Sequence, residues 1–289
     1  MKMKFSKEKW MNIIFKTIGL IVLFLISLLF LYPILWLFDA SFRPMIEIFQ
    51  VPPILIQKGI PSAFSTYGFA SYVKAIVDWR LIESFINSTV VTVFGIALTL
   101  AVCSLSAYAF SYLKFPGRNI FFIIILSTMM LPLTTMIVPY YRVLRMLQLT
   151  NNLFGLIVPY AGSAFCVFLL RQYFIKIPSS FLESARLDGI NNFQILRFII
   201  MPLAKPALAA LAIIQFRVIW NDFLYPVIIL RNEDLFTLPI KIMLIDSQHF
   251  NKPYDAIIAT GFVAAIVPIV FFLIFQRQFI EGLTGGLKS

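Results

Sequence analysis

Long apolar blocks, separated by shorter polar segments, dominate the pattern of this chain. A bilayer core about 30 Å thick needs roughly 20 apolar residues per spanning helix. Six blocks meet that length, at residues 14–38, 85–111, 120–141, 152–174, 206–230 and 255–276. The first block is too long for the apolar region of a signal peptide, and no small-residue cleavage site follows it. The pattern therefore predicts an all-α membrane protein with six transmembrane helices, forming one domain over residues 14–276.

Proline lies inside several of the predicted spans. The positions are Pro132, Pro139, Pro159, Pro226 and Pro268. Membrane helices tolerate such kinks where neighbouring groups satisfy the freed carbonyls. Several kinked helices in one bundle favour a moving pathway over a static anchor.

Composition supports the membrane class. Hydrophobic residues make up 60% of the chain and charged residues 13%, whereas soluble domains have about 25% charged residues. The net charge of +11 does not predict a nucleic-acid partner, because a basic patch needs a soluble surface. Cys103 and Cys166 lie inside apolar blocks without a CxxC pair, so we expect core residues.

The distribution of Lys and Arg predicts the orientation. With the N-terminus inside, the inside segments carry 14 of these residues and the outside segments nine. The cluster in residues 1–16 and the loop at 171–205 carry most of this bias. Cytoplasmic loops are enriched in Lys and Arg, so residues 1–13 and the tail at 277–289 are both predicted to be cytoplasmic. The outside segments 39–84 and 231–254 are long enough to fold or to bind, although solvated linkers would also explain them.

The cytoplasmic loop at 178–202 has the signals of two short helices joined at a glycine. Ser180 and Glu183 have the spacing of a capping box, and Gly189 suits the left-handed position that ends a helix. The first helix should therefore cover residues 181–188. Asn191 or Asn192 can cap a second helix.

The second helix is expected to run to about Ile200, stopped by Pro202 through its restriction on the preceding residue. Asn191, Gln194 and Arg197 form one polar stripe on it. The first helix carries apolar residues expected to be exposed, namely Phe181, Leu182 and Leu187. A short helix with exposed apolar residues is suited to docking in a cleft of a partner protein, although a plain surface loop would also explain this segment.

This elbow resembles the loop shared by permeases of binding-protein-dependent ABC importers. That pattern is Glu-Ala-Ala, three residues, Gly, nine residues, Ile, one residue, Leu-Pro. The chain matches it at Glu183, Ser184, Ala185, Gly189, Ile199, Met201 and Pro202. Ser184 replaces Ala and Met201 replaces Leu, and both changes are small. Further segments resemble the carbohydrate branch, of the maltose-permease MalG type, at residues 168–172, 220–226 and 279–288.

The resemblance implies partners and a mechanism. It implies a second permease subunit, two ATPase subunits, an extracellular solute-binding protein and a sugar substrate, in a bacterial or archaeal plasma membrane. ATP and Mg would be bound by the partner ATPase, with no cofactor on this chain. ATP binding would close the ATPase pair, move the elbow and switch the spans from inward to outward opening.

The resemblance also implies roles for residues. In the family the elbow is the coupling helix that sits in a groove of the ATPase, which here assigns coupling to Glu183, Ser184, Ala185, Asp188, Gly189 and Pro202. Family tails reach between the ATPase subunits, which makes Gly282, Thr284 and Gly285 contact candidates. Residues 279–288 are not expected to form a regular helix, so a frayed terminus is the alternative.

The fifth span carries polar residues that are costly in a bilayer. Arg217, Asn221 and Asp222 should face the bundle interior or water. Pro226 cannot donate to the carbonyl of Asp222, so a wet polar patch is expected there. Either this patch lines or gates the pathway, or it clamps helices together. The resemblance of Trp220–Pro226 to the family favours the first alternative.

Other functions lack their residues. No GxxxxGK[ST] motif is present, so the chain has no P-loop and ATP hydrolysis is expected on a partner. The single histidine, His249, cannot build a metal cluster or a triad. No catalytic residue and no metal ligand is assigned, which argues against an intramembrane hydrolase. A channel or secondary transporter of a small polar solute, working without an ATPase, remains the alternative.

Overall fold

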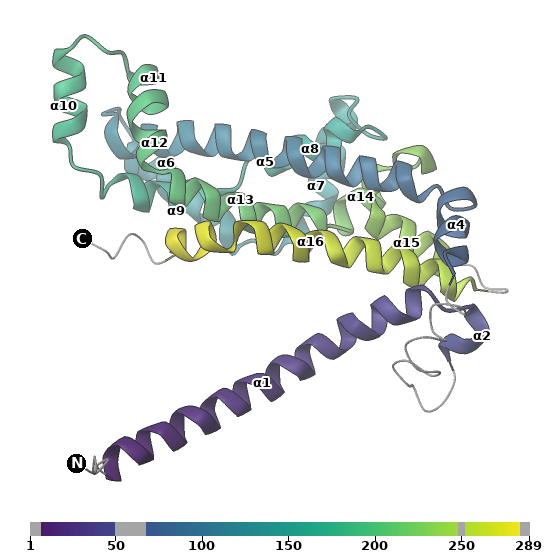
Figure 1. Cartoon of the computed structure of the whole chain (residues 1–289). Coiled ribbons are helices and arrows are strands. Elements are labelled where there is room, and N and C mark those ends of the chain that lie inside the picture. Colours follow the sequence, from purple (N-terminus) through teal and green to yellow (C-terminus); the bar gives the residue numbers. More distant parts are fainter. Residues whose placement is uncertain (1–6, 50–67, 248–251, 284–289) are drawn as a thin grey trace. The chain divides into compact units, whose positions relative to one another are not determined.

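The computed structural model describes residues 7–49, 68–247 and 252–283 (Figure 1). Within these ranges every regular element is helical, which confirms the all-α class. Three helices are long and apolar enough to cross a membrane, and up to six spans result if each of three bent helix pairs counts as one. The chain divides into two compact units, of which the first comprises residues 1–78 and 248–262.

The first unit contains α1 (Lys7–Ser41), α2 (Met45–Ile48), α4 (Ala70–Val77) and the start of α16 (Tyr254–Leu283). Its polar contacts gather at the end of α1. Arg43 pairs with Asp39, both nearly buried, and the hydroxyl of Tyr72 donates to Ser41 Oγ at 2.7 Å. Lys74 Nζ lies 3.2 Å from Asp255 Oδ2, which ties α4 to α16.

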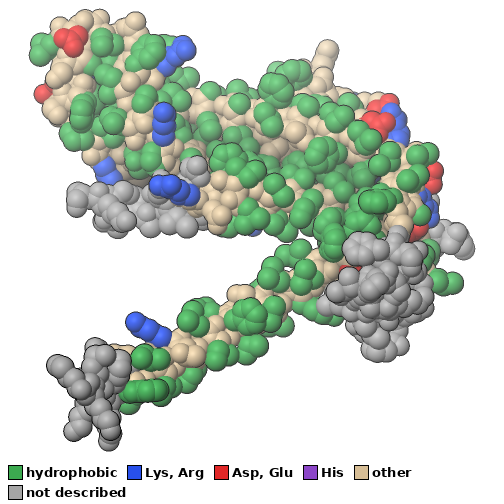
Figure 2. Space-filling model, viewed as in Figure 1, with side chains coloured by type: hydrophobic (Ala, Val, Ile, Leu, Met, Phe, Trp, Pro, Cys, Tyr) green, Lys and Arg blue, Asp and Glu red, His purple; other side chains and the backbone are tan. Residues whose placement is uncertain are grey.

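The apolar residues of α1 are exposed along most of its length, and Figure 2 shows hydrophobic side chains over the helix surface. A helix that is apolar all round and uncovered suits lipid or a second membrane protein.

The second unit is built around α5 (Leu81–Tyr112). This helix packs against α8 (Leu153–Tyr160), α9 (Ala164–Phe174) and α13 (Lys205–Trp220). Small and polar residues are buried along α5, among them Asn87, Thr92, Thr99 and Ser104. Such residues let helices approach closely and hydrogen-bond across the interface.

The second unit also contains α16 from Val263 on, and its remaining helices are short. They are α6 (Arg118–Ser127), a 3-10 turn at Thr128–Met130, α7 (Leu133–Met146), α10 (Ser180–Leu187), α11 (Asn192–Ile195), a π-helical turn at Leu196–Ile200, α12 (Met201–Leu203), α14 (Leu224–Ile229), a 3-10 turn at Glu233–Leu235 and α15 (Leu238–Asp246). The segment 231–246, for which solvated linkers were an alternative, is thus largely folded.

Three predicted spans are not continuous helices. The span at 120–141 bends by 114° between α6 and α7, and the span at 152–174 bends by 41° between α8 and α9. In the first case Leu131 is extended, with ψ 125°, because Pro132 disfavours the helical conformation of the residue before it. The span at 206–230 is interrupted at 221–223, between α13 and α14.

Candidate functional site

The first helix of the elbow, α10, begins one residue earlier than predicted. Ser180 is already helical, and Ser179 at the N-cap makes no side-chain capping bond. The predicted capping box of Ser180 and Glu183 is therefore wrong. Instead the carbonyl of Ser179 accepts from the backbone N–H groups of Leu182 at 2.9 Å and Glu183 at 3.0 Å.

The end of α10 confirms the role of Gly189. Its φ is +77°, a conformation that costs other residues energy because of Cβ crowding. Gly189 N donates to Arg186 O at 3.1 Å and Ile190 N to Ala185 O at 3.0 Å. This pair of bonds is the Schellman motif. No atom lies within 4 Å of the place where a Cβ would sit, so the backbone angle alone selects glycine.

The second helix begins as predicted and ends differently. Asn191 Oδ1 accepts from Gln194 N at 2.9 Å, and Gln194 Oε1 accepts from Asn191 N at 3.0 Å, a complete capping box. The helix then continues past Ile200 to Leu203, so Pro202 does not stop it. The π-helical turn directly before Pro202 alters the hydrogen-bond spacing where the proline lacks a donor. The chain bends by 81° on entering α13.

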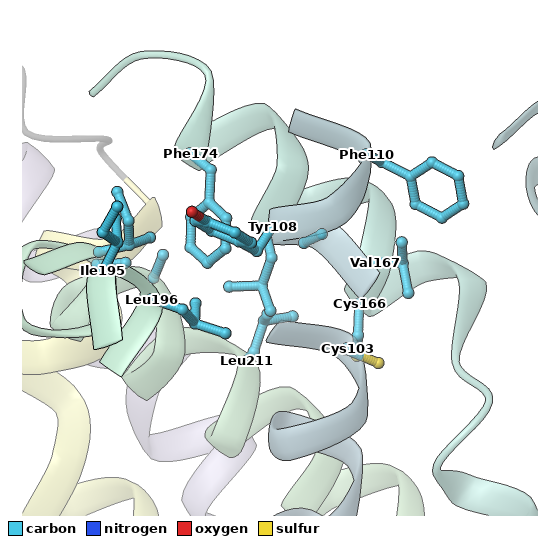
Figure 3. Packing of buried hydrophobic residues seen from close by; sticks show 14 of the residues in the cluster. Cys103, Tyr108, Phe110, Cys166, Val167, Phe174, Ile195, Leu196 and Leu211 are labelled. Atoms are coloured by element: carbon cyan, nitrogen blue, oxygen red, sulfur yellow. The ribbon is translucent and has the colours of Figure 1, made fainter. Parts of the chain in front are cut away.

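Apolar side chains anchor the elbow in the unit. Leu182 and Ala185 of α10 and Ile195 of α11 are buried in one cluster with residues of α5, α9 and α13. Figure 3 shows Ile195 and Leu196 facing the region of Tyr108, Phe174 and Leu211. The hydroxyl of Tyr108 in α5 also lies 3.1 Å from Asn192 Oδ1. The elbow therefore cannot shift without moving the helices that it contacts.

The opposite face of α10 is open. Leu187 is 90% exposed and Phe181 50% exposed, as predicted, whereas Leu182 is only 3% exposed and was wrongly expected on this face. Leucines 182 and 187 lie five residues apart, so they point about 140° away from each other around the helix axis. Four of the coupling candidates are exposed on or directly after α10, namely Glu183, Ser184, Asp188 and Gly189. Pro202 is also exposed, at the far end of the second helix, whereas Ala185 is buried.

The polar residues of the fifth span lie at the break between α13 and α14. Asp222 Oδ2 accepts from the hydroxyl of Tyr160 in α8 at 2.5 Å. Its Oδ1 accepts from Leu224 N at 2.9 Å and Tyr225 N at 3.4 Å, so it caps α14. Asn221 is exposed and its side chain donates to Arg217 O at 2.9 Å.

Pro226 differs from expectation. Because α14 begins at Leu224, Pro226 lies in a first turn, where its missing donor removes no intrahelical bond. The predicted free carbonyl of Asp222 therefore does not explain the polarity here. Arg217 is exposed and takes no part in the hydrogen bond between Tyr160 and Asp222.

The tail is described only up to Leu283. Helix α16 includes Gly282, so the expectation of no regular helix from residue 279 is wrong for residues 279–283. Thr284 and Gly285 lie outside the described residues, as does His249. Cys103 and Cys166 are both buried and unpaired, as predicted, and no cluster of metal-ligating residues occurs in the described ranges.

Sequence reasoning missed the two tyrosines that join these sites to the bundle. Tyr108 and Tyr160 sit in apolar blocks, and hydropathy alone treats them as aromatic core residues. A buried tyrosine hydroxyl usually has a hydrogen-bond partner, so each was a signal for a polar contact. The partner could not be named, since Asn192 and Asp222 are 84 and 62 residues away.

Comparisons with known proteins agree with this architecture. Residues 102–284 match the family model described as binding-protein-dependent transport system inner membrane component. The chain is 39% identical to the arabinooligosaccharides transport system permease protein AraQ of Bacillus subtilis, over 92% of this chain and 93% of that protein. It is 30% identical to the sn-glycerol-3-phosphate transport system permease protein UgpE of Rhizobium meliloti, over 92% and 95%.

A solved structure is also similar. A chain of a bacterial ABC transporter involved in the import of the acidic polysaccharide alginate matches with a TM-score of 0.81 and 27% identity. The match covers 96% of this chain and all of that one.

Proposed function

The chain belongs to the family of binding-protein-dependent transport system inner membrane components, and from this premise we propose that it is the transmembrane permease subunit of an ATP-driven sugar importer. It is a transport component and not an enzyme. The observation that carries the sugar assignment is the 39% identity to an arabinooligosaccharide permease over nearly the whole chain.

The proposed partners follow from the family. We expect a second permease subunit, two ATPase subunits and an extracellular solute-binding protein. The alginate transporter supports the last of these, because a related solved structure is described in complex with an alginate pentasaccharide-bound periplasmic protein. ATP and Mg would be bound by the ATPase subunits.

We propose that the open face of α10 docks in a groove of the ATPase subunit. The support is its shape and chemistry: two exposed apolar side chains, Phe181 and Leu187, stand beside the exposed acidic residues Glu183 and Asp188. The opposite face of the elbow is packed into the bundle core. Movement of the ATPase pair would therefore be passed to α5, α9 and α13, which alternates access to the pathway.

The polar break at Asp222 is the proposed pathway element. It lies where α13 ends, and it is bonded to α8 through Tyr160. A helix break that carries a carboxylate places a polar contact between neighbouring helices. Such a contact suits a gate better than an uninterrupted apolar helix does. The tail beyond Leu283 is proposed to contact the ATPase subunits through Thr284 and Gly285, with Gly282 at the end of α16.

Uptake measured in a deletion strain tests this function. The panel would include arabinooligosaccharides, other mono- and oligosaccharides, alginate oligosaccharides and sn-glycerol 3-phosphate. We expect loss of ATP-dependent uptake of one oligosaccharide class, restored by the gene on a plasmid. If only glycerol phosphate uptake is lost, the substrate is sn-glycerol 3-phosphate, as the name of the UgpE relatives indicates. Uptake that continues without any ATPase partner would support a channel or secondary transporter.

A further inference from the structure

A groove lies between α5 and the second helix of the elbow, and apart from Pro202 its lining residues have no role in the proposed transport function. Its volume is about 520 Å³, within the range of roughly 300–1,000 Å³ that small-molecule pockets occupy. It lies in the second unit, between Ser104 of α5 and the bend that leads into α13.

Two cationic side chains line this groove. Arg197 and Lys205 line it, and both are exposed. Lys205 is the first residue of α13, whose N-cap Ala204 makes no side-chain capping bond, so the positive end of this helix dipole lies there. No acidic residue lines the groove.

A buried serine of α5 lines the same groove. Ser104 is 1% exposed, so the wall of the groove on this side is closed by helix packing.

The other lining residues of the groove are mainly apolar. Leu208 lies one helical turn beyond Lys205 in α13, and Leu105 and Ala101 lie on α5. A groove that combines two cations with an apolar wall matches a charged headgroup with an acyl chain.

We propose that this groove binds one anionic phospholipid. Arg197, Lys205 and the start of α13 hold the phosphate, and an acyl chain lies against Ala101, Leu105 and Leu208. Basic pockets between membrane helices on the cytoplasmic side bind anionic headgroups in this way. The side of the membrane rests on the proposed orientation, whereas the site itself is independent of which sugar is carried.

The test uses the assembled, purified importer in nanodiscs of phosphatidylcholine with or without phosphatidylglycerol. Native mass spectrometry, or exchange of a fluorescent phosphatidylglycerol, reports the lipid that stays bound. Arg197→Gln combined with Lys205→Gln should weaken phosphatidylglycerol binding roughly 30-fold, because each basic residue near an anionic surface contributes about one factor of five. Phosphatidylcholine binding should not change.

Lys114→Gln combined with Lys176→Gln is the matched control, since both residues are exposed, are predicted to lie on the same side, and do not line the groove. Leu105→Trp should displace the lipid while both cations remain. Inorganic phosphate should not compete, because it lacks the acyl chain.

Three results would overturn the proposal. The first is an equal loss of phosphatidylglycerol binding in the control variant, and the second is no preference of the parent complex for phosphatidylglycerol. The third is loss of the second permease subunit from the Arg197 and Lys205 variant, which would make the groove a subunit interface. None of these readouts depends on transport, so failure of the lipid site and failure of the sugar assignment are separable.

Discussion

The hydroxyl of Tyr160 in α8 donates a hydrogen bond of 2.5 Å to Oδ2 of Asp222, in the break between α13 and α14. The same carboxylate caps α14 through Oδ1. One side chain thus joins three helices at the interruption of the predicted fifth span. Whether this joint gates the pathway or only holds the helices together is open to a direct test.

Tyr160→Phe removes the interhelical bond and keeps the ring. We expect sugar uptake, or the stimulation of ATP hydrolysis by the loaded binding protein, to fall several-fold, because a hydrogen bond to a charged group contributes about 1.5–3 kcal/mol. Asp222→Asn should act similarly, and the double variant should be no worse than either single one. Asn221→Ala should lower uptake as well if the whole polar break lines the pathway, although its side chain bonds to Arg217 O within its own helix. Variants that no longer assemble would instead indicate a structural clamp.

Gly189→Val should abolish transport while the protein still reaches the membrane. The backbone there has φ +77° with open space around it, so the substitution acts through the angle, which is unfavourable for a β-branched residue. Gly189→Asn is the matched control, because asparagine tolerates the left-handed region. We expect at least tenfold lower uptake for valine and near-parent uptake for asparagine. Normal uptake by the valine variant would remove the reason for a glycine in the elbow.

Deletion of residues 284–289 leaves α16 complete to Leu283. If the tail contacts the ATPase subunits, the truncated importer should hydrolyse ATP with a smaller response to the loaded binding protein. The measurement is the ratio of stimulated to basal hydrolysis in purified complex. A ratio equal to that of the parent would identify the tail as a frayed terminus.

Single cysteines test the orientation. Leu187 is 90% exposed and Ile46 is 84% exposed, whereas both native cysteines are buried, so background labelling should be low. An impermeant maleimide added to intact cells should label Ile46→Cys and spare Leu187→Cys until the membrane is opened. The reverse pattern would place the elbow outside and remove the coupling role.

Local signals predicted parts of the elbow well. Gly189 and the pair of Asn191 and Gln194 act within a few residues, so their backbone geometry follows from sequence spacing. The start of α10 was placed one residue late because Ser179 and Ser180 are both serines and the N-cap residue, Ser179, makes no side-chain capping bond.

Longer-range features were less accessible. Hydropathy windows found the apolar blocks, and Pro132 and Pro159 indicated kinks in two of them, but the size of the bends, 114° and 41°, was not predicted. Leu182 was placed on the wrong face, since the direction of the core is set by α5, α9 and α13. The bond between Tyr160 and Asp222 depends on how α8 lies against the break, which no local pattern contains.

The central claim is that α10 couples this permease to an ATPase subunit, and cross-linking tests it most directly. Leu187→Cys in the purified, assembled importer would be labelled with a short thiol-reactive photo-cross-linker, which after illumination reacts with any neighbouring side chain, and the adduct identified by mass spectrometry. The account predicts a covalent adduct between Leu187→Cys and an ATPase subunit, none with Ile46→Cys, and loss of coupled hydrolysis once the adduct forms. An intact, transporting complex in which Leu187→Cys reacts with no ATPase subunit would contradict it.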